Sequence, residues 1–317
     1  MSGIVSSHGR LRVRGNRIVD SHGRPFMLRG VSLFWSQWMP QFYNADVVAW
    51  LRADWGANVV RASLAVCRDG YLDHPEREAA RICKVVEAAI AEDLYVIVDW
   101  HAHEREQAAA LGFFTDMARR YGRYPHVIFE TWNEPAAQYK WLSDIRPYHE
   151  AITGAIREHA PRGLIVAGTE NFSQGVDKAA GDPVADDNTA YTLHFYAASH
   201  REKLRQRAQA AVQSGIALIA TEYGTCEATG DGVFAPEETL KWWAFLEGNG
   251  IGCLNWAISD KAETAAALRP GAAVDGKWLP GDLTPSGQLV RTYLRSRRPR
   301  PAAGPGLPPN PRTACEA

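Results

Sequence analysis

Two glutamates, Glu134 and Glu222, follow short apolar runs and are the main candidates for chemistry in this chain. Glu134 lies in the segment Trp-Asn-Glu-Pro, and Glu222 lies in Thr-Glu-Tyr-Gly. Each run has the length of a buried strand, and the Pro or Gly just beyond each acid favours a turn. Ionised carboxylates are rarely buried without a partner. Two of them at the ends of core strands therefore indicate a functional site, and paired carboxylates are suited to proton transfer.

Eight apolar or β-branched runs would provide the strands that carry these acids. They are residues 27–33, 59–64, 95–100, 127–132, 164–168, 190–196, 217–223 and 252–258. Most are separated by Ala-rich segments with apolar residues at helical spacing, such as Ile82, Val85, Val86 and Ala89. Continuous apolar strands that alternate with helices indicate a parallel sheet covered by helices. Eight such units predict an α/β fold, the closed (β/α)8 TIM barrel, and no GxGxxG motif supports a dinucleotide-binding sheet instead.

The two ends of the chain differ from this pattern. Residues 1–10 are expected to form an N-terminal tail, and residues 11–19 read as a β-hairpin around Gly15 that caps the bottom of the barrel. The barrel itself is expected to span residues 11–294. Residues 295–317 are rich in Arg, Pro and Gly and poor in apolar residues. This composition predicts a disordered tail.

Length, charge and cysteine content narrow the class of partner. The 317 residues can form one large core, and a formal net charge of -1 gives no electrostatic footprint for nucleic acid. No stretch reaches the roughly 18 apolar residues of a membrane span. The five cysteines contain no CxxC pair and are odd in number. We therefore expect no zinc site, no complete disulfide framework and no cofactor.

Polar and aromatic residues gather at the ends of the predicted strands, where barrel enzymes place their reacting groups. In chain order they are Trp38, Arg61, Asp99, His101, His103, Asn133, Glu134, His194, Tyr196, Glu222, Tyr223, Trp256, Lys261 and Glu263. Glu130 precedes Glu134 by four residues, which places it roughly 13 Å deeper along an extended strand. We expect Glu130 and Asp99 to be internal ion-pair partners rather than catalytic groups.

Seven short motifs at these strand ends resemble those of one known family. They are Gly30-Val31-Ser32 with Gln37-Trp38, Val60-Arg61, Val98-Asp99-Trp100-His101, Trp132-Asn133-Glu134-Pro135, His194-Phe195-Tyr196, Thr221-Glu222-Tyr223-Gly224 and Asn255-Trp256. Across roughly residues 11–294 the chain resembles glycoside hydrolase family 5, whose members are (β/α)8 retaining glycosidases. It is most similar to the bacterial endo-β-1,4-glucanases of that family. One Asn-Glu-Pro would be weak evidence, whereas seven motifs in the family's order are specific.

The resemblance implies that Glu222 is the nucleophile and Glu134 the acid/base of a retaining hydrolysis. In that mechanism the two carboxyl groups lie about 5 Å apart; one forms a glycosyl-enzyme, and the other protonates the leaving oxygen and then activates water. We expect the nearby charge of Arg61 to keep Glu222 ionised. Glu134 must be protonated for the first step, so we expect desolvation and its anionic neighbour to raise its pKa.

The resemblance also implies a set of substrate-binding residues. Asn133 would donate a hydrogen bond to the sugar 2-hydroxyl, and His101 and His194 would line the reacting subsite. Tyr196 and Tyr223 would donate hydrogen bonds near the carboxylates. Trp256 and Trp38 would be platforms for sugar rings, and Lys261 with Glu263 would hold a more distant glucosyl unit. A non-proline cis peptide bond is expected after Trp256. Phe34 stands where many relatives have a histidine, and the short segment after His101 would open one side of the cleft. No family role is assigned to His103.

The sequence thus predicts a metal-independent, monomeric endo-β-1,4-glucanase that acts on cellulose-type or mixed-linkage glucans. Mannan, xylan or lichenan is the alternative substrate, because platforms and loops choose the sugar while the acids act on the anomeric centre. A catalytically silent carbohydrate-binding barrel is a weaker reading, since both glutamates, Asn133 and Arg61 are present. A barrel for phosphorylated substrates would need a Gly-rich cradle after its last strands. The family suggests secretion, although residues 1–15 contain no stretch of signal-peptide length.

Overall fold

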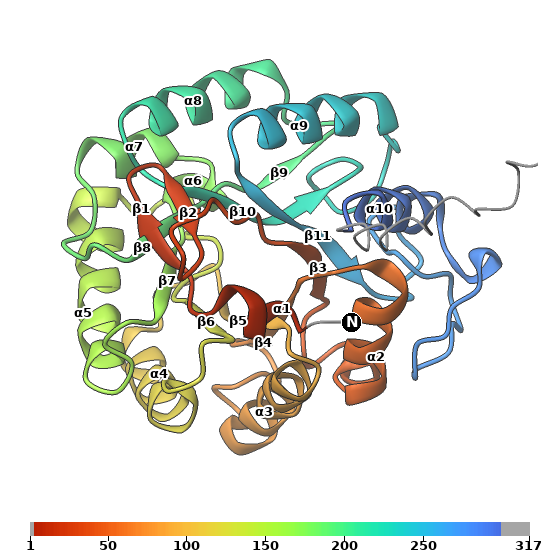
Figure 1. Ribbon diagram of the computed structural model, residues 1–317, viewed down its shortest axis with the longest axis horizontal. Coiled ribbons are helices and arrows are strands. Elements are labelled where there is room, and N and C mark those ends of the chain that lie inside the picture. Colours follow the sequence, from red (N-terminus) through yellow and green to blue (C-terminus); the bar gives the residue numbers. More distant parts are fainter. Residues whose placement is uncertain (1–2, 299–317) are drawn as a thin grey trace, which may run out of the picture.

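Parallel strands form a closed ring inside a ring of helices, which confirms the predicted (β/α)8 barrel (Figure 1). The computed structural model describes residues 3–298. The barrel strands are β3 (Arg29–Leu33), β4 (Val59–Ala65), β5 (Tyr95–His101), β6 (Val127–Glu130), β7 (Leu164–Ala167), β8 (Thr189–Thr192), β9 (Phe195–Tyr196), β10 (Leu218–Gly224) and β11 (Gly252–Ile258). The pairing of β11 with both β10 and β3 closes the ring.

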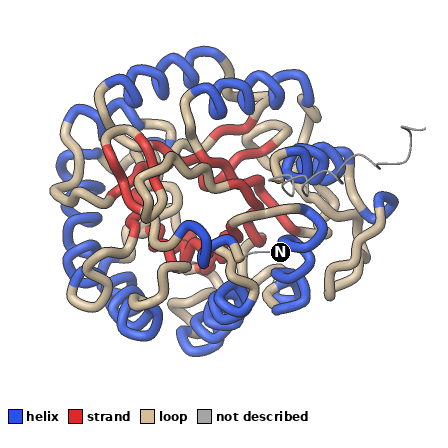
Figure 2. The backbone as a smooth tube through the Cα atoms, viewed as in Figure 1, coloured by secondary structure: helices blue, strands red, loops and turns tan. Residues whose placement is uncertain are grey.

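Helices cover the outside of the barrel, as the strand and helix colours of Figure 2 show. They are α2 (Ala45–Trp50), α3 (Pro75–Ala91), α4 (Gln107–Tyr121), α5 (Arg146–Arg157), α7 (Val176–Gly181), α8 (Glu202–Gln213), α9 (Pro236–Gly248) and α10 (Pro285–Ser296). The short α6 (Glu170–Ser173) lies after the carboxyl end of β7, with Asn171 and Phe172 in left-handed conformations. Local signals start several of them: Asn44 caps α2, Thr284 caps α10, and a proline opens α3.

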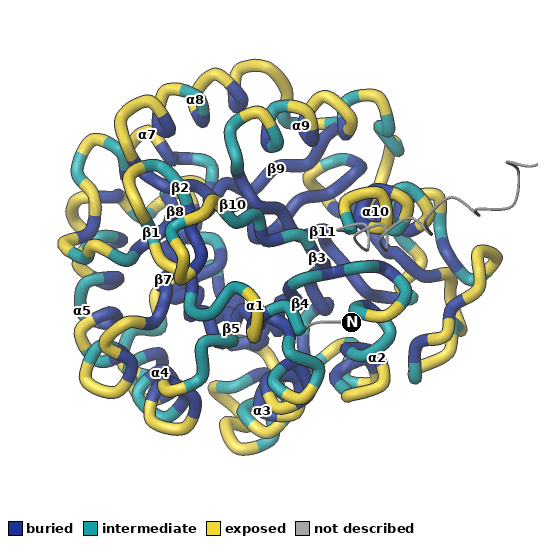
Figure 3. The backbone as a smooth tube through the Cα atoms, in the orientation of Figure 1, coloured by how far each residue is buried: buried dark blue, intermediate teal, exposed yellow. Residues whose placement is uncertain are grey.

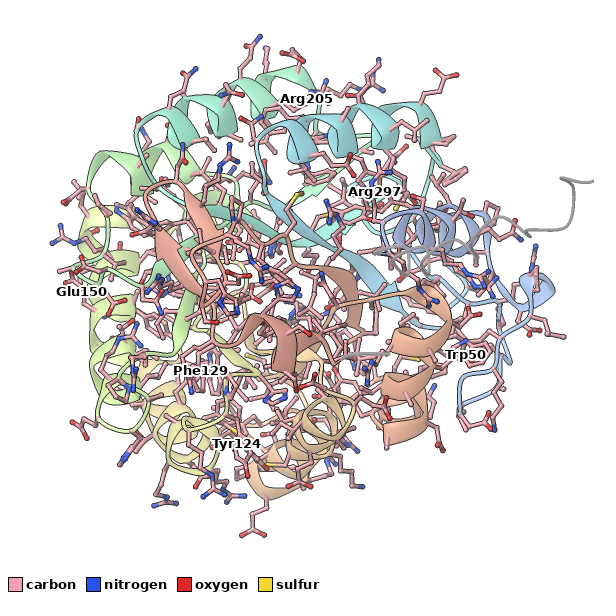
Figure 4. The ribbon with its side chains drawn as sticks, in the orientation of Figure 1. Trp50, Tyr124, Phe129, Glu150, Arg205 and Arg297 are labelled. Carbon is pink, nitrogen blue, oxygen red and sulfur yellow. The ribbon has the colours of Figure 1, made fainter. Side chains whose placement is uncertain are left out.

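The apolar core lies on both sides of the strands. Between strands and helices, the helical positions predicted from spacing, Ile82, Val85, Val86 and Ala89, are buried. Figure 3 shows buried strands at the centre and exposed backbone on the outer faces of the helices. Charged side chains lie on those outer faces, for example Glu150 of α5 in Figure 4. The barrel therefore holds the carboxyl ends of its strands in a fixed framework.

A hairpin and a short helix cover the amino ends of the strands. β1 (Arg12–Arg14) pairs antiparallel with β2 (Arg17–Val19), and Val5 of α1 (Ile4–His8) joins Leu11 and Ile18 in an apolar cluster with the first residues of the barrel strands. The hairpin thus lies at the bottom of the barrel, as expected. The sequence indicated a tail for residues 1–10, whereas the structure forms helix α1 there. Of the expected C-terminal tail, Arg295 and Ser296 belong to α10, and residues 299–317 lie outside the described residues.

Two strands deviate from regular pairing next to the predicted site. The sixth predicted strand is interrupted between β8 and β9, where the backbone N–H of His194 donates to the carbonyl oxygen of Ser173 instead of to a neighbouring strand. In β10, residues Ala220 and Tyr223 lie opposite Cys253 and Asn255 of β11, so that two residues of β10 face one of β11. This bulge changes which side chains point into the barrel.

Candidate active site

Arg61 of β4 lies at the centre of a buried polar cluster at the mouth of the barrel. Its Nε and Nη2 atoms donate to the two oxygens of Glu130 at 2.7 and 3.1 Å, and Nη1 donates to Glu222 Oε2 at 3.2 Å. Nη2 also lies 3.0 Å from Asp99 Oδ2. Burial alone would lower the pKa of Arg61, but these three carboxylates raise it well above its usual value. Arg61 is therefore a permanent cation, and the expected ion pairs of Glu130 and Asp99 are confirmed.

Two groups that keep the same protonation state near neutral pH hold Glu222 in place. Besides Arg61, the hydroxyl of Tyr196 donates to Glu222 Oε1 at 2.8 Å. Burial first, and the charge of Glu222 second, raise the pKa of Tyr196 well above that of free tyrosine. Both oxygens of Glu222 thus accept hydrogen bonds. Neither donor loses its proton near neutral pH, so these two contacts orient the side chain in the same way across that range.

The second tyrosine predicted near the carboxylates, Tyr223, is not in the site, and that prediction is wrong. Its ring stacks on Phe195 at 5.3 Å and meets Trp243 edge-on, in the layer between the barrel and α9. The physical reason is the bulge in β10: it turns both Thr221 and Glu222 toward the interior, so that Tyr223 faces outward.

Two histidines contact Glu134, one on each oxygen. His194 Nδ1 lies 2.9 Å from Oε1, and His103 Nε2 lies 3.3 Å from Oε2. Burial raises the pKa of Glu134, but the hydrogen bonds and charges of the two histidines outweigh it and lower the pKa below the usual range. The expectation of a raised pKa for Glu134 is therefore wrong. In turn, Glu134 raises the pKa of His103, and it raises that of His194 against the opposing effect of burial.

His101 is held by Asp99 on its inner side. Asp99 Oδ2 lies 2.7 Å from His101 Nδ1, and the ring stacks on Trp256 at 4.9 Å with an interplanar angle of 3°. Burial lowers the pKa of His101 to about 3, and burial raises that of Asp99 to about 7 although Arg61 opposes it. A neutral His101 that donates from Nδ1 to Asp99 presents Nε2 as an acceptor toward the cleft.

Asn133 is oriented by the same cluster. Its Oδ1 accepts from Arg61 Nη2 at 2.6 Å, whereas its Nδ2 is buried without a hydrogen-bond partner within residues 3–298. An unpaired amide donor is costly in a folded protein, and such atoms are common where a ligand supplies the acceptor. The geometry therefore leaves one donor of Asn133 for a substrate hydroxyl.

A cleft of about 230 Å³ opens above Glu134 and Glu222, and most predicted substrate contacts line it. Trp256 forms its floor beside Phe34, with ring centroids 5.1 Å apart, and the peptide bond after Trp256 is cis. Trp38 is 54% exposed and stands at the rim. Lys261 pairs with Glu263 and lies over the Phe34 ring. Besides Tyr223, three predicted substrate contacts are buried and do not line the cleft: Arg61, Asn133 and His194.

The two carboxylates approach each other closely enough for joint chemistry. One oxygen each of Glu134 and Glu222 and one ring nitrogen of His194 lie within 4.8 Å of one another. These donor types could hold a metal ion, but each of the three side chains already takes part in hydrogen bonds or ion pairs. The hydrogen bonds and ion pairs of these side chains thus suffice to explain why they lie close together.

Sequence reasoning did not assign roles to two residues that the structure brings to the site. His103 contacts Glu134, and Trp35 packs edge-on against His101 at 4.2 Å. A second hollow of about 370 Å³ lies beside Trp35, next to the short segment that follows His101. The short segment and the two aromatic rings were visible in the sequence, but only the fold shows that His103 reaches an oxygen of Glu134.

Comparisons with known proteins agree with this geometry. A family model described as cellulase (glycosyl hydrolase family 5) matches residues 19–262. Endoglucanase Z of Dickeya dadantii is 44% identical over 90% of this chain and 66% of its own length. An endoglucanase of Clostridium saccharobutylicum is 41% identical over 92% of this chain and 66% of its own length. The chain thus spans about two thirds of these curated relatives.

Solved structures extend the likeness to three dimensions. A structure from Cytophaga hutchinsonii is 49% identical and superposes with a TM-score of 0.93, covering 94% of this chain and 98% of that one. The catalytic domain of Thermobifida fusca endoglucanase Cel5A is 32% identical with a TM-score of 0.89, covering 93% of this chain and 100% of its own, and a Glu-to-Gln variant of that domain has been solved with cellotetraose. Among the described residues, no helix is both long and apolar enough to cross a membrane.

Proposed function

This chain belongs to glycosyl hydrolase family 5, and from that membership we propose that its barrel is a retaining endo-β-1,4-glucanase. The proposed substrates are cellulose-type and mixed-linkage glucans, cut at internal bonds. One observation carries the proposal: oxygens of Glu134 and Glu222 lie within 4.8 Å of each other at the base of one cleft. Retaining glycosidases place their carboxyl groups about 5–5.5 Å apart, whereas inverting ones leave about 6.5–9.5 Å for a water molecule.

In the first step Glu222 attacks the anomeric carbon while Glu134 protonates the departing glycosidic oxygen. The contacts of Arg61 and Tyr196 support Glu222 as the nucleophile, because they hold both of its oxygens in place. In the second step Glu134, now ionised, takes a proton from water, and that water releases the sugar from Glu222. The bond to Glu222 breaks and the original configuration is restored.

Glu134 needs a proton before it can act as an acid. The histidine contacts lower its pKa and Glu134 raises that of His194, which favours the proton on the histidine side. A bound glucan would exclude water from the cleft, and desolvation disfavours the charged forms of both the carboxylate and the histidine, which returns the proton to the carboxyl group. The free donor of Asn133 would meet the sugar 2-hydroxyl, a contact that strengthens in the oxocarbenium-like transition state.

The cleft supports a neutral, flat substrate. Trp38 and Trp256 offer aromatic faces, and the paired Lys261 and Glu263 offer hydrogen-bonding groups without a net charge. All of these groups come from one chain, so the proposal is of a monomeric enzyme that needs no partner subunit, metal or cofactor.

The test is the release of reducing ends by the purified protein from carboxymethyl cellulose, mixed-linkage β-glucan, mannan and xylan, in the presence of a chelator. We expect activity on both glucans and a rapid fall in viscosity, because internal cleavage shortens chains before it produces many ends. Activity confined to mannan or xylan would replace the substrate but keep the mechanism. A protein inactive on all four would contradict the proposed function.

A further inference from the structure

A chain of buried hydrogen bonds runs from Glu130 to Glu134 and is not used by the mechanism described so far. Thr221 Oγ1 lies 2.7 Å from Glu130 Oε1 and 2.8 Å from His194 Nε2. The other nitrogen of the same ring, Nδ1, lies 2.9 Å from Glu134 Oε1. Thr221, His194 and Glu130 are all buried. Thr221 points into the barrel like Ile219 two residues before it, and the bulge in β10 lets the next residue, Glu222, point to the same side.

The direction of the first hydrogen bond follows from Arg61. A guanidinium group has donors only, and it supplies one N–H to each oxygen of Glu130. Burial raises the pKa of Glu130 although Arg61 opposes it. The geometry nevertheless favours the ionised form, which can only accept, because both oxygens receive an N–H of the guanidinium group. The single hydrogen of the Thr221 hydroxyl must therefore point at Glu130.

The tautomer of His194 then follows. Because Thr221 has no second hydrogen, it meets Nε2 of His194 as an acceptor, so Nε2 carries a proton. Nδ1 is left with either a lone pair or a second proton. If Nδ1 had a lone pair and Glu134 were ionised, two lone pairs would face each other at 2.9 Å. One shared proton between Nδ1 and Oε1 removes this repulsion.

We propose that Thr221 is a positioning residue which locks the tautomer of His194 and thereby keeps one proton shared between His194 and Glu134. This inference rests on the proposed function, in which Glu134 is the acid/base. Without the hydroxyl, a neutral His194 could move its proton to Nδ1 and donate to ionised Glu134. In that arrangement the pair of His194 and Glu134 holds one proton fewer without repulsion. Glu134 then has no proton to give to the leaving group. The lock therefore extends the active range toward higher pH.

Other charges around His194 act in known directions. Glu134 and Glu222 favour its cationic form, and Glu130 lies 3.9 Å from Nε2, whereas Arg61 opposes the cation. His103 contacts Glu134 from the solvent side. None of these groups can replace the acceptor that Thr221 offers to Nε2, because no other hydrogen bond of Nε2 exists within the described residues.

The variant Thr221→Val tests this role, because it keeps the β-branched shape and removes only the hydroxyl. We expect the alkaline limb of kcat/KM on mixed-linkage β-glucan to move down by about one pH unit, the shift that one hydrogen bond of ordinary strength produces. Well above both limbs, where the activity of each protein falls with pH, Thr221→Val should be about tenfold less active on β-glucan than the wild type. Activity on 2,4-dinitrophenyl cellobioside should fall less than about twofold, because its leaving group needs no proton.

Two further variants serve as controls. Thr221→Ser keeps the hydroxyl and should retain the wild-type pH profile. Thr192→Val removes a buried hydroxyl from the neighbouring strand β8, and that hydroxyl has no hydrogen-bond partner within residues 3–298, so no shift is expected. An unchanged alkaline limb in Thr221→Val, or an equal loss on both substrates, would overturn the proposal. Inactivity of the wild type on all glucans would instead contradict the proposed function.

A spectroscopic readout covers the case in which Thr221→Val does not fold. Wild-type protein labelled with ¹⁵N-histidine reports the tautomer of each ring, and a His194→Asn sample identifies the signal. At a pH above the alkaline limb we expect the Nε2–H form of His194 in the wild type. The Nδ1–H form in the wild type would overturn the proposal.

Discussion

Glu222 and Glu134 face each other across one cleft, but their surroundings differ in kind. Glu222 is held by Arg61 and Tyr196, whose charges do not change near neutral pH because the pKa values of both are raised. Glu134 is held by His103 and His194, and histidine is the side chain that titrates in this range. The difference matches the two roles. A nucleophile must stay ionised until it attacks, whereas an acid/base must gain and lose a proton in every cycle.

The largest expected effect comes from removing the permanently held carboxylate. Glu222→Ala should lower kcat on β-glucan about 10⁵-fold or more, as expected when a nucleophile is lost. Azide fits the space that is vacated and should restore turnover of an aryl cellobioside, giving the α-glycosyl azide by a single displacement. Rates are measured from reducing ends, and the product's configuration is measured by NMR.

Glu134→Ala is the matched control on the other side of the cleft. It should retain the first step on 2,4-dinitrophenyl cellobioside, seen as a burst of dinitrophenolate, while losing activity on β-glucan. Wild-type rates in Glu222→Ala would refute its role as nucleophile. An α-azide from Glu134→Ala would reverse the two assignments.

A smaller effect should follow from the solvent-facing histidine. His103 is half-exposed and, when protonated, its charge disfavours a proton on Glu134. Because its pKa is raised, this charge persists above the usual pKa of histidine and disappears as the pH rises further. His103→Asn should therefore move the alkaline limb of kcat/KM upward by about 0.3–0.5 pH units, since solvent screens the exposed pair.

The direction of that shift is opposite to the one expected for Thr221→Val, which makes the two variants controls for each other. The measurement is the same pH profile on mixed-linkage β-glucan. A downward shift in His103→Asn would show that His103 supplies the acid's proton rather than competing with it.

The fold was predictable because the barrel strands lie in mainly apolar runs and the segments between them repeat apolar residues at helical spacing. The motif residues were predictable as well, since each stands at the end of such a run. What the sequence did not reveal is orientation at the irregular points. Because of a bulge in β10, the adjacent residues Thr221 and Glu222 both point into the barrel and Tyr223 points away from the cleft, an order that strict alternation does not predict.

The electrostatic error has a similar origin. The sequence places one carboxylate near another, and like charges raise the pKa of the acid. It does not show that His103 and His194, distant in sequence from each other, meet the two oxygens of Glu134. Their combined effect lowers its pKa instead. Contacts between residues far apart in the sequence decide whether the pKa of such an acid is raised or lowered. These contacts follow from the closed barrel rather than from the local sequence pattern.

The most direct test of this account is the configuration of the first product. Hydrolysis of cellotetraose followed by ¹H NMR during the first minutes distinguishes α from β anomers before mutarotation. The close approach of Glu134 and Glu222 predicts that the new reducing end appears as the β anomer. Initial appearance of the α anomer would contradict the account, because it would require a water molecule where the structure places the carboxylate of Glu222.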